Sequence, residues 1–151
     1  MEPVDQTIFG NTNGNCFPAC LASILEIPLD TIPNFCATPG DWIRAANKWM
    51  STYGLCILEW DLAEDGALCG MNGLADGAWV VISGKSPRGD FLHAVVGRYR
   101  DDEELGTHKL EYVHDPHPSR SYHDGPAKHA DFFVAINPQD RHPYGKRMEG
   151  E

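Results

Sequence analysis

The chain has 151 residues, 42% of them hydrophobic, which is enough for one folded domain with a core and excludes a disordered chain. Its net charge of −10 argues against nucleic acid and anionic membranes as general partners, because an acidic surface repels phosphate groups. No apolar run approaches the ~20 residues that cross a membrane, and the N-terminus lacks the basic start and apolar stretch of a signal peptide. Together with five irregularly spaced cysteines, these features predict a cytoplasmic protein with free thiols.

The first predicted element is a helix that begins near Cys16, after an extended arm and a loop rich in glycine and asparagine at residues 10–15. Pro18 fits its first turn, where a missing N–H costs nothing, and Pro28 ends it. Apolar residues at spacings of three and four give this helix one buried stripe, formed by Phe17, Cys20, Leu21, Ile24 and Leu25.

A second helix is predicted from about residue 40 to residue 53. Thr38 or Asp41 is expected to cap its start, and Gly54 is expected to end it. Its buried face is expected to hold Trp42, Ala45, Ala46 and Trp49.

From residue 55 onward the pattern changes to short strands joined by hairpin turns. The predicted strands cover residues 55–60, 78–83, 91–100, 108–115 and 130–137. Helices first and strands after predict an α+β fold, with N-terminal helices packed on an antiparallel β-sheet. We expect one domain over residues 1–138 and a polar tail over residues 139–151.

Cys16 is the candidate nucleophile because it stands where the first helix begins. The free N–H groups and the dipole at a helix start favour the thiolate, which is the nucleophilic form of cysteine. The backbone N–H of the same residue could form half of an oxyanion hole. The alternative interpretation is a small apolar core residue, a role for which Cys20, one turn later, is better placed.

A base for this thiol is expected among the seven histidines, and His93 is the candidate because it interrupts the apolar run 91–96. If the acidic turn between the third and fourth strands is centred on Glu104, His93 stands directly opposite Asp115. The carboxylate would then fix the tautomer of the ring. Taken singly, each residue has an ordinary alternative: a core histidine bonded to a carbonyl, and an Asp-Pro turn.

Three short motifs follow one another in the chain: NCFPAC from residue 15, LHAVV from residue 92 and HDP from residue 114. In this order the chain resembles the papain-like cysteine peptidase superfamily. It is most similar to bacteriocin-processing peptidase domains and to small bacteriophage and bacterial proteins that begin with a similar DQT…GNC stretch. The resemblance spans residue 6 to about residue 116. It implies a papain-like fold and a Cys16–His93–Asp115 triad, working in a host cytoplasm if the protein is phage-encoded.

The resemblance also implies a glutamine before the cysteine, whose side-chain amide completes the oxyanion hole. Gln6 is the matching residue, although it stands ten residues upstream, farther than the family usually has it. Asn15 is the alternative donor. The implied reaction is attack of the Cys16 thiolate on an amide or related acyl carbon of a protein or peptide. A thioester forms and water hydrolyses it, without any cofactor.

Two other patterns predict no site. Cys16 and Cys20, and the loose set of histidines at positions 114, 117, 123 and 129, lack the paired spacing of zinc ligands, so no metal is expected. The glycines between residues 66 and 77 lack the Lys-Ser/Thr and the strand-to-helix setting of a phosphate loop, and are interpreted as a loop bordering the cleft.

Two alternatives to the hydrolase stay open at this point. One is a non-catalytic papain-like protein that binds and blocks a host or bacterial protein. The other is an acyltransferase or a deamidase that uses the same three residues. An activated thiolate at Cys16 separates either enzyme from the binding protein.

Overall fold

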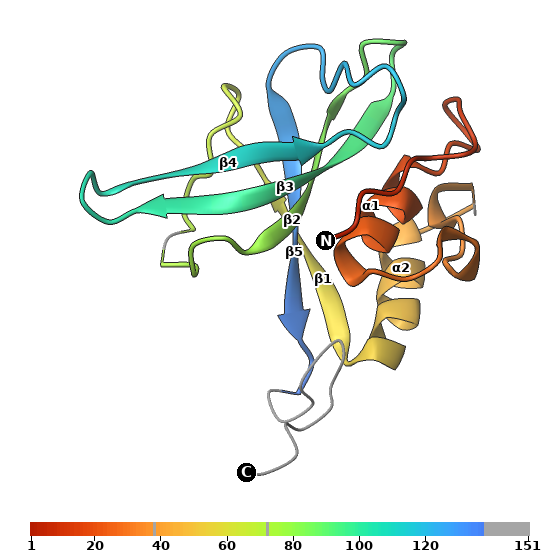
Figure 1. The fold of residues 1–151 in the computed structure, drawn as a ribbon, viewed down its shortest axis with the longest axis horizontal. Helices are drawn as coiled ribbons and strands as arrows, with labels where there is room; N and C mark the ends of the chain where they lie inside the picture. The colour runs from red at the N-terminus through yellow and green to blue at the C-terminus, as the bar shows by residue number, and fades with distance from the viewer. Residues whose placement is uncertain (38, 72, 138–151) are drawn as a thin grey trace.

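The computed structural model describes residues 1–37, 39–71 and 73–137, so Thr38 and the predicted tail lie outside the described residues. Within them, two α-helices precede a five-stranded antiparallel sheet, which confirms the predicted α+β class (Figure 1). Neither helix is long and apolar enough to cross a membrane. The elements are α1 Cys16–Leu25, α2 Trp42–Met50, β1 Leu55–Asp61, β2 Trp79–Lys85, β3 Leu92–Asp102, β4 Thr107–His114 and β5 Ala127–Ala135, with 3₁₀ turns at Leu29–Thr31, Phe35–Ala37 and Ser51–Tyr53.

The ends of both helices follow from local chemistry. Asp41 caps α2 by accepting a hydrogen bond from the Arg44 backbone N–H at 3.0 Å. Gly54 ends the 3₁₀ turn that follows α2, in a left-handed conformation with φ of 72°. Helix α1 ends before Pro28, as predicted, and its first residue is Cys16.

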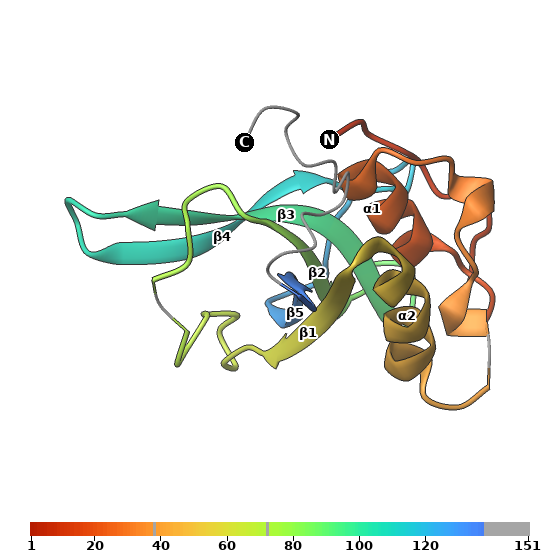
Figure 2. The same ribbon diagram turned by 90° about the horizontal axis from the view of Figure 1, so that it is seen from below.

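The strands run in the order β1-β5-β2-β3-β4, and every neighbouring pair is antiparallel. Both helices lie on one face of the sheet, where α1 packs on β3 and α2 on β1 (Figure 2). The core on that face includes Phe17, Leu21, Met50, Val81 and Val96. The long loop before β2 covers the other face, where the core includes Leu68, Val80, Ile82, Val95 and Tyr99. Because both faces are covered, β2 and β3 are apolar at successive positions.

The predicted register of the β3–β4 hairpin is wrong. The turn is centred half a residue further along than expected, with Gly106 in a left-handed conformation (φ 63°), and a bulge follows Val96, which pairs with His114. Strand β4 ends there, so Asp115 lies just beyond the ladder and not opposite His93. The last strand also departs from expectation, since it covers Ala127–Ala135 instead of residues 130–137.

One acidic group lies in the core on the helix side of the sheet. The side chain of Asp131 on β5 is 1% exposed, and neither of its carboxylate oxygens has a hydrogen-bond partner among the described residues. Burial, together with the charge of Glu59, raises the pKa of this carboxyl to about 8. Buried carboxyl groups normally have hydrogen-bond partners, so this residue calls for a physical explanation.

Candidate active site

Cys16 is the first residue of α1 and is partly exposed. Burial by itself disfavours the thiolate, but a hydrogen bond with His93 and the N–H groups of Ala94 and Phe17 outweigh it. The pKa of the Cys16 thiol is therefore lowered. The Phe17 N–H belongs to the first turn of the helix, where such groups have no partner within the helix itself.

His93, at the start of β3, lies between the thiol and a carboxylate. Its side chain is 2% exposed, and its Nε2 atom is 2.7 Å from Oδ1 of Asp115. Because Nε2 is used in this way, Nδ1 is the ring nitrogen left to face Cys16. Burial lowers the pKa of the imidazole, but the bonds with Asp115 and Cys16 more than compensate and raise it. Opposite shifts in the two partners favour a thiolate–imidazolium pair.

Asp115 is fully buried and has hydrogen bonds on both carboxylate oxygens. Besides the His93 ring, Oδ1 accepts a bond from the His117 backbone N–H at 2.8 Å, and Oδ2 accepts one from the Tyr122 N–H at 2.8 Å. Burial opposes ionisation, yet these bonds hold the pKa of Asp115 at about 2. The carboxylate is thus charged at neutral pH and fixed in orientation.

Sequence analysis missed the part played by the loop between β4 and β5. The sequence indicates only a connection between two strands there, but the loop supplies both backbone donors to Asp115 and also contacts His93. His123 Nε2 bonds to the His93 carbonyl at 2.9 Å, and the rings of His117 and His123 lie 6.3 and 6.2 Å from the His93 ring, edge to face. No periodicity or motif spacing marked these residues.

Gln6 and Asn15, the two candidate oxyanion donors, have different surroundings. Gln6 is 6% exposed; its backbone N–H bonds to the Pro116 carbonyl at 2.9 Å, and its Nε2 donates to the Ile8 carbonyl at 2.9 Å. The Ile8 carbonyl also accepts the Asn15 N–H, so the Gln6 amide lies at the start of α1. The Asn15 side chain accepts bonds from the N–H groups of Thr7 and Ile8 and thereby holds this loop. The Asn15 amide also donates to Thr7 Oγ1 at 3.1 Å, so Asn15 is bonded to the loop through both its oxygen and its nitrogen.

Arg120 joins the two segments that flank the site. Its guanidinium donates a hydrogen bond to the Asp115 carbonyl and forms an ion pair with Asp5 at 2.7 Å. Asp5 directly precedes Gln6 in the chain. Arg120 itself has a left-handed backbone with φ of 50°, which is strained for a residue with a side chain. One residue therefore holds both the segment with the acid and the arm with the candidate oxyanion donor.

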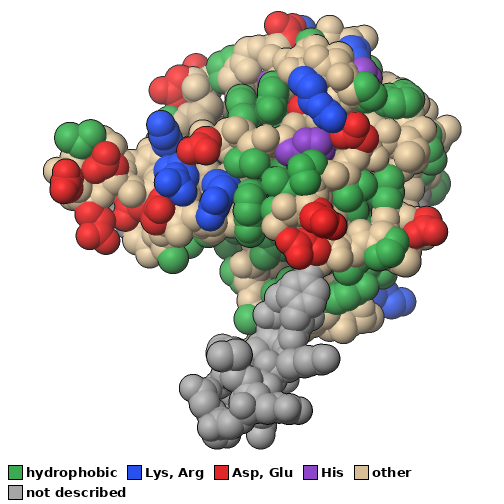
Figure 3. Space-filling view, in the orientation of Figure 1, with side chains coloured by type: hydrophobic (Ala, Val, Ile, Leu, Met, Phe, Trp, Pro, Cys, Tyr) green, Lys and Arg blue, Asp and Glu red, His purple; other side chains and the backbone are tan. Residues whose placement is uncertain are grey.

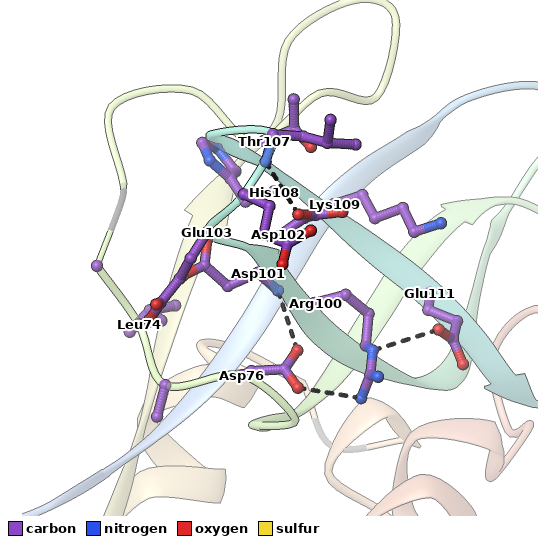
Figure 4. Close-up of a pocket in the computed structure, with 14 residues that line it drawn as sticks. Leu74, Asp76, Arg100, Asp101, Asp102, Glu103, Thr107, His108, Lys109 and Glu111 are labelled. Atoms are coloured by element: carbon purple, nitrogen blue, oxygen red, sulfur yellow. Dashed lines mark hydrogen bonds and ion pairs between the residues drawn. The ribbon is translucent and has the colours of Figure 1, made fainter.

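Two hollows lie in different parts of the molecule, one at the β3–β4 hairpin and one beside the start of α1. The larger, of about 1000 Å³, lies at the protruding β3–β4 hairpin and is lined by charged side chains such as Asp76, Arg100 and Glu111 (Figure 4). The glycine-rich loop contributes Gly73 to this hollow. A smaller one, of about 510 Å³, adjoins the start of α1, with Ile8, Asn15, Pro18, Leu29 and Ile32 among its lining residues.

Comparison with protein-family models, with curated proteins and with solved structures gives no match for this chain. The geometry of the site therefore carries what can be inferred about its function.

Proposed function

We propose that the chain is a cysteine-dependent hydrolase, a peptidase or amidase of papain-like fold, that acts through Cys16, His93 and Asp115. The observation that carries the proposal is the continuous chain of contacts from a thiol at a helix start, through a buried imidazole, to a buried carboxylate 2.7 Å away. An ordinary core cysteine has no need of this arrangement. The opposite pKa shifts of the thiol and the imidazole support the same interpretation.

The proposed reaction has two steps, acylation of Cys16 and hydrolysis of the thioester, and His93 transfers one proton in each step. The Cys16 thiolate attacks an acyl carbon, and the His93 imidazolium gives its proton to the leaving amine as the C–N bond breaks. A thioester remains on Cys16. Water then attacks the thioester while His93 takes a proton from that water, and the C–S bond breaks to release the acid and restore the thiolate–imidazolium pair. Asp115 stabilises the imidazolium and holds the ring in orientation.

Gln6 is the proposed side-chain donor of the oxyanion hole. An amide nitrogen carries two N–H donors, so one can serve the Ile8 carbonyl while the other meets the oxyanion. The Cys16 backbone N–H is the second donor. Loss of one such donor typically costs ~3 kcal/mol of transition-state stabilisation.

The proposed substrate is a protein or peptide, with the hollow beside α1 available for one of its side chains. All five cysteines, each in the described part of the chain, are free thiols. The reaction requires a reduced Cys16, so we propose that the protein acts in a reducing compartment. If the protein is phage-encoded, that compartment is the host cytoplasm.

The test is whether an acyl group is transferred to Cys16. The full chain is incubated with a library of fluorogenic peptide amides, and amine release and protein mass are followed together. We expect release together with an acyl adduct on Cys16, and loss of both in Cys16→Ser. The matched control is Cys56→Ser, which removes another partly exposed thiol.

The same experiment distinguishes the alternatives. Transfer of the acyl group to an added amine, in place of water, would identify an acyltransferase. A protein that only binds and blocks a partner would give neither the adduct nor amine release, and its Cys16 would react with alkylating agents like a free thiol.

A further inference from the structure

A second cluster of ionisable groups lies on strands β1 and β5, which are neighbours at one side of the sheet (Figures 1 and 2). Glu59, Asp61 and His129 each offer one ligand atom, and these atoms all lie within 4.8 Å of one another. Glu59 and Asp61 are exposed and His129 is half-buried, so the cluster can be reached from solvent.

Strand register explains why these side chains gather. Glu59 is the partner of Asp131, and Asp61 is the partner of His129, in consecutive positions on the same face of the antiparallel pair. Directly opposed residues have Cβ atoms ~5 Å apart, and the next pair on that face is ~7 Å along. Asp131 is therefore a sheet neighbour of the cluster, although its side chain is not among the three whose ligand atoms lie within 4.8 Å of one another.

The Asp131 side chain supplies an observation independent of the exposed cluster. It is 1% exposed, its two oxygens have no hydrogen-bond partner among the described residues, and it faces the same side as Glu59, whose charge acts on it. The alternative explanation of the cluster is a surface ion pair between Asp61 and His129, which are 2.9 Å apart. Such a pair leaves the buried carboxyl unexplained, whereas a cation bound by Glu59 would place a compensating positive charge on the same face of the sheet as Asp131.

We propose that Glu59, Asp61 and His129 bind one divalent cation of the zinc type, whose charge also stabilises the buried carboxylate of Asp131, the sheet partner of Glu59. Zinc accepts imidazole nitrogen together with carboxylate oxygen, usually from four ligands. Magnesium and calcium favour oxygen alone, so the imidazole selects against them. The site is separate from the Cys16–His93–Asp115 triad, and the proposal does not depend on the proposed function.

The direct test is titration of the full chain with Zn²⁺, using a competing zinc-sensitive dye. We expect one site per chain, weakened roughly tenfold or more in His129→Ala. A smaller loss of affinity is expected in Asp131→Asn, which removes a nearby charge and keeps the size of the side chain. The matched control is His108→Ala, which removes an imidazole from β4, outside the cluster, and leaves the affinity unchanged. Asp61→Asn alters an 86%-exposed side chain and tests the cluster even if the Asp131 variant fails to fold.

Co²⁺ as a spectroscopic probe separates this cluster from the thiol at Cys16. Nitrogen and oxygen ligands give only weak visible bands, whereas a thiolate adds strong sulfur-to-metal absorption in the near ultraviolet. Weak bands that persist in Cys16→Ser support the proposal. Strong absorption that disappears in Cys16→Ser would overturn it, as would equal Zn²⁺ affinity in His129→Ala and His108→Ala, ready displacement by equimolar Mg²⁺, or no binding at all.

Discussion

Each end of strand β3 holds a basic side chain that contacts acidic groups from other segments, but the two contacts differ in their exposure to solvent. At its start, His93 and Asp115 are almost completely buried and 2.7 Å apart. At its far end, Arg100 is 39% exposed and lies 3.5 Å from Asp76 and 3.6 Å from Glu111. Figure 3 shows both signs of charge on the hairpin that carries this far end, facing solvent.

The difference shows why only one end of β3 can perturb a pKa strongly. Water screens exposed ion pairs, whose net contribution to stability is commonly below ~1 kcal/mol. In a buried pair, the same charges act through a medium of lower polarity and are also held by backbone hydrogen bonds. The hollow of about 1000 Å³ lies at the exposed end, but the candidate chemistry lies at the buried one.

The largest effect is expected from His93→Ala. Removal of the general base should lower amide hydrolysis by roughly 10²–10⁴-fold, the usual contribution of such a group. Steady-state rates of amine release measure it, with Cys56→Ser as the control that should retain the wild-type rate. Comparable rates in wild type and His93→Ala would remove the imidazole from the mechanism.

Asp115→Asn should be the next largest, because an amide cannot accept all three hydrogen bonds of the carboxylate. The pKa of Asp115 falls from 3.8 to about 2 on folding, so its ionised form contributes stability above ~pH 4, and this contribution is lost as the pH drops through about 2. The variant should lose about 2 kcal/mol of unfolding free energy at neutral pH. In urea unfolding, the gap to wild type should shrink toward pH 2; a gap independent of pH would contradict this interpretation.

Arg120→Ala tests a case between the two ends of β3. The Arg120–Asp5 ion pair is about half exposed, but Arg120 also bonds to the carbonyl of the buried Asp115. We expect a stability loss of ~1 kcal/mol or less and a fall in hydrolysis of up to roughly tenfold, since Gln6 and Asp115 would be held less firmly. Arg120→Lys should not restore the rate, because an ammonium cannot bond to Asp5 and to the Asp115 carbonyl with the same geometry. An unchanged rate in both variants would assign Arg120 to stability alone.

Arg100→Ala should have the smallest effect. Its two contacts are long and exposed, so we expect less than ~0.5 kcal/mol in urea unfolding, a loss that disappears in high salt, and an unchanged hydrolysis rate. A loss above ~1 kcal/mol would mean that the two ends of β3 do not differ as the burial of their side chains indicates.

Much of this architecture could be predicted because it depends on local patterns. The start of α1 at Cys16, the Asp41 cap and the succession of helices and then strands along the chain follow from apolar spacing, capping residues and turn formers. The sheet order does not follow, because hairpin turns between successive strands would pair β1 with β2 and not with β5. Cys16 and His93 were selected by the same local reasoning, one as the residue that opens a helix and the other as a polar interruption of a strand.

The rest depends on tertiary contacts that carry no local signal. Asp115 was chosen from a register that is wrong, and it reaches His93 only because a bulge and the end of β4 redirect the chain. The donors of its loop, and the pairing of β1 with β5, join segments whose spacing has no period. For the same reason, no pattern in the sequence indicates that Glu59 and Asp61 lie beside His129.

The central claim is that the His93 imidazole activates the Cys16 thiol, and the rate of Cys16 alkylation by iodoacetamide as a function of pH tests it most directly. We predict an inflection below the ~8.5 of a free thiol in the wild-type chain, and a shift to higher pH in His93→Ala. Identical profiles for the two proteins, both with the inflection of a free thiol, would contradict it.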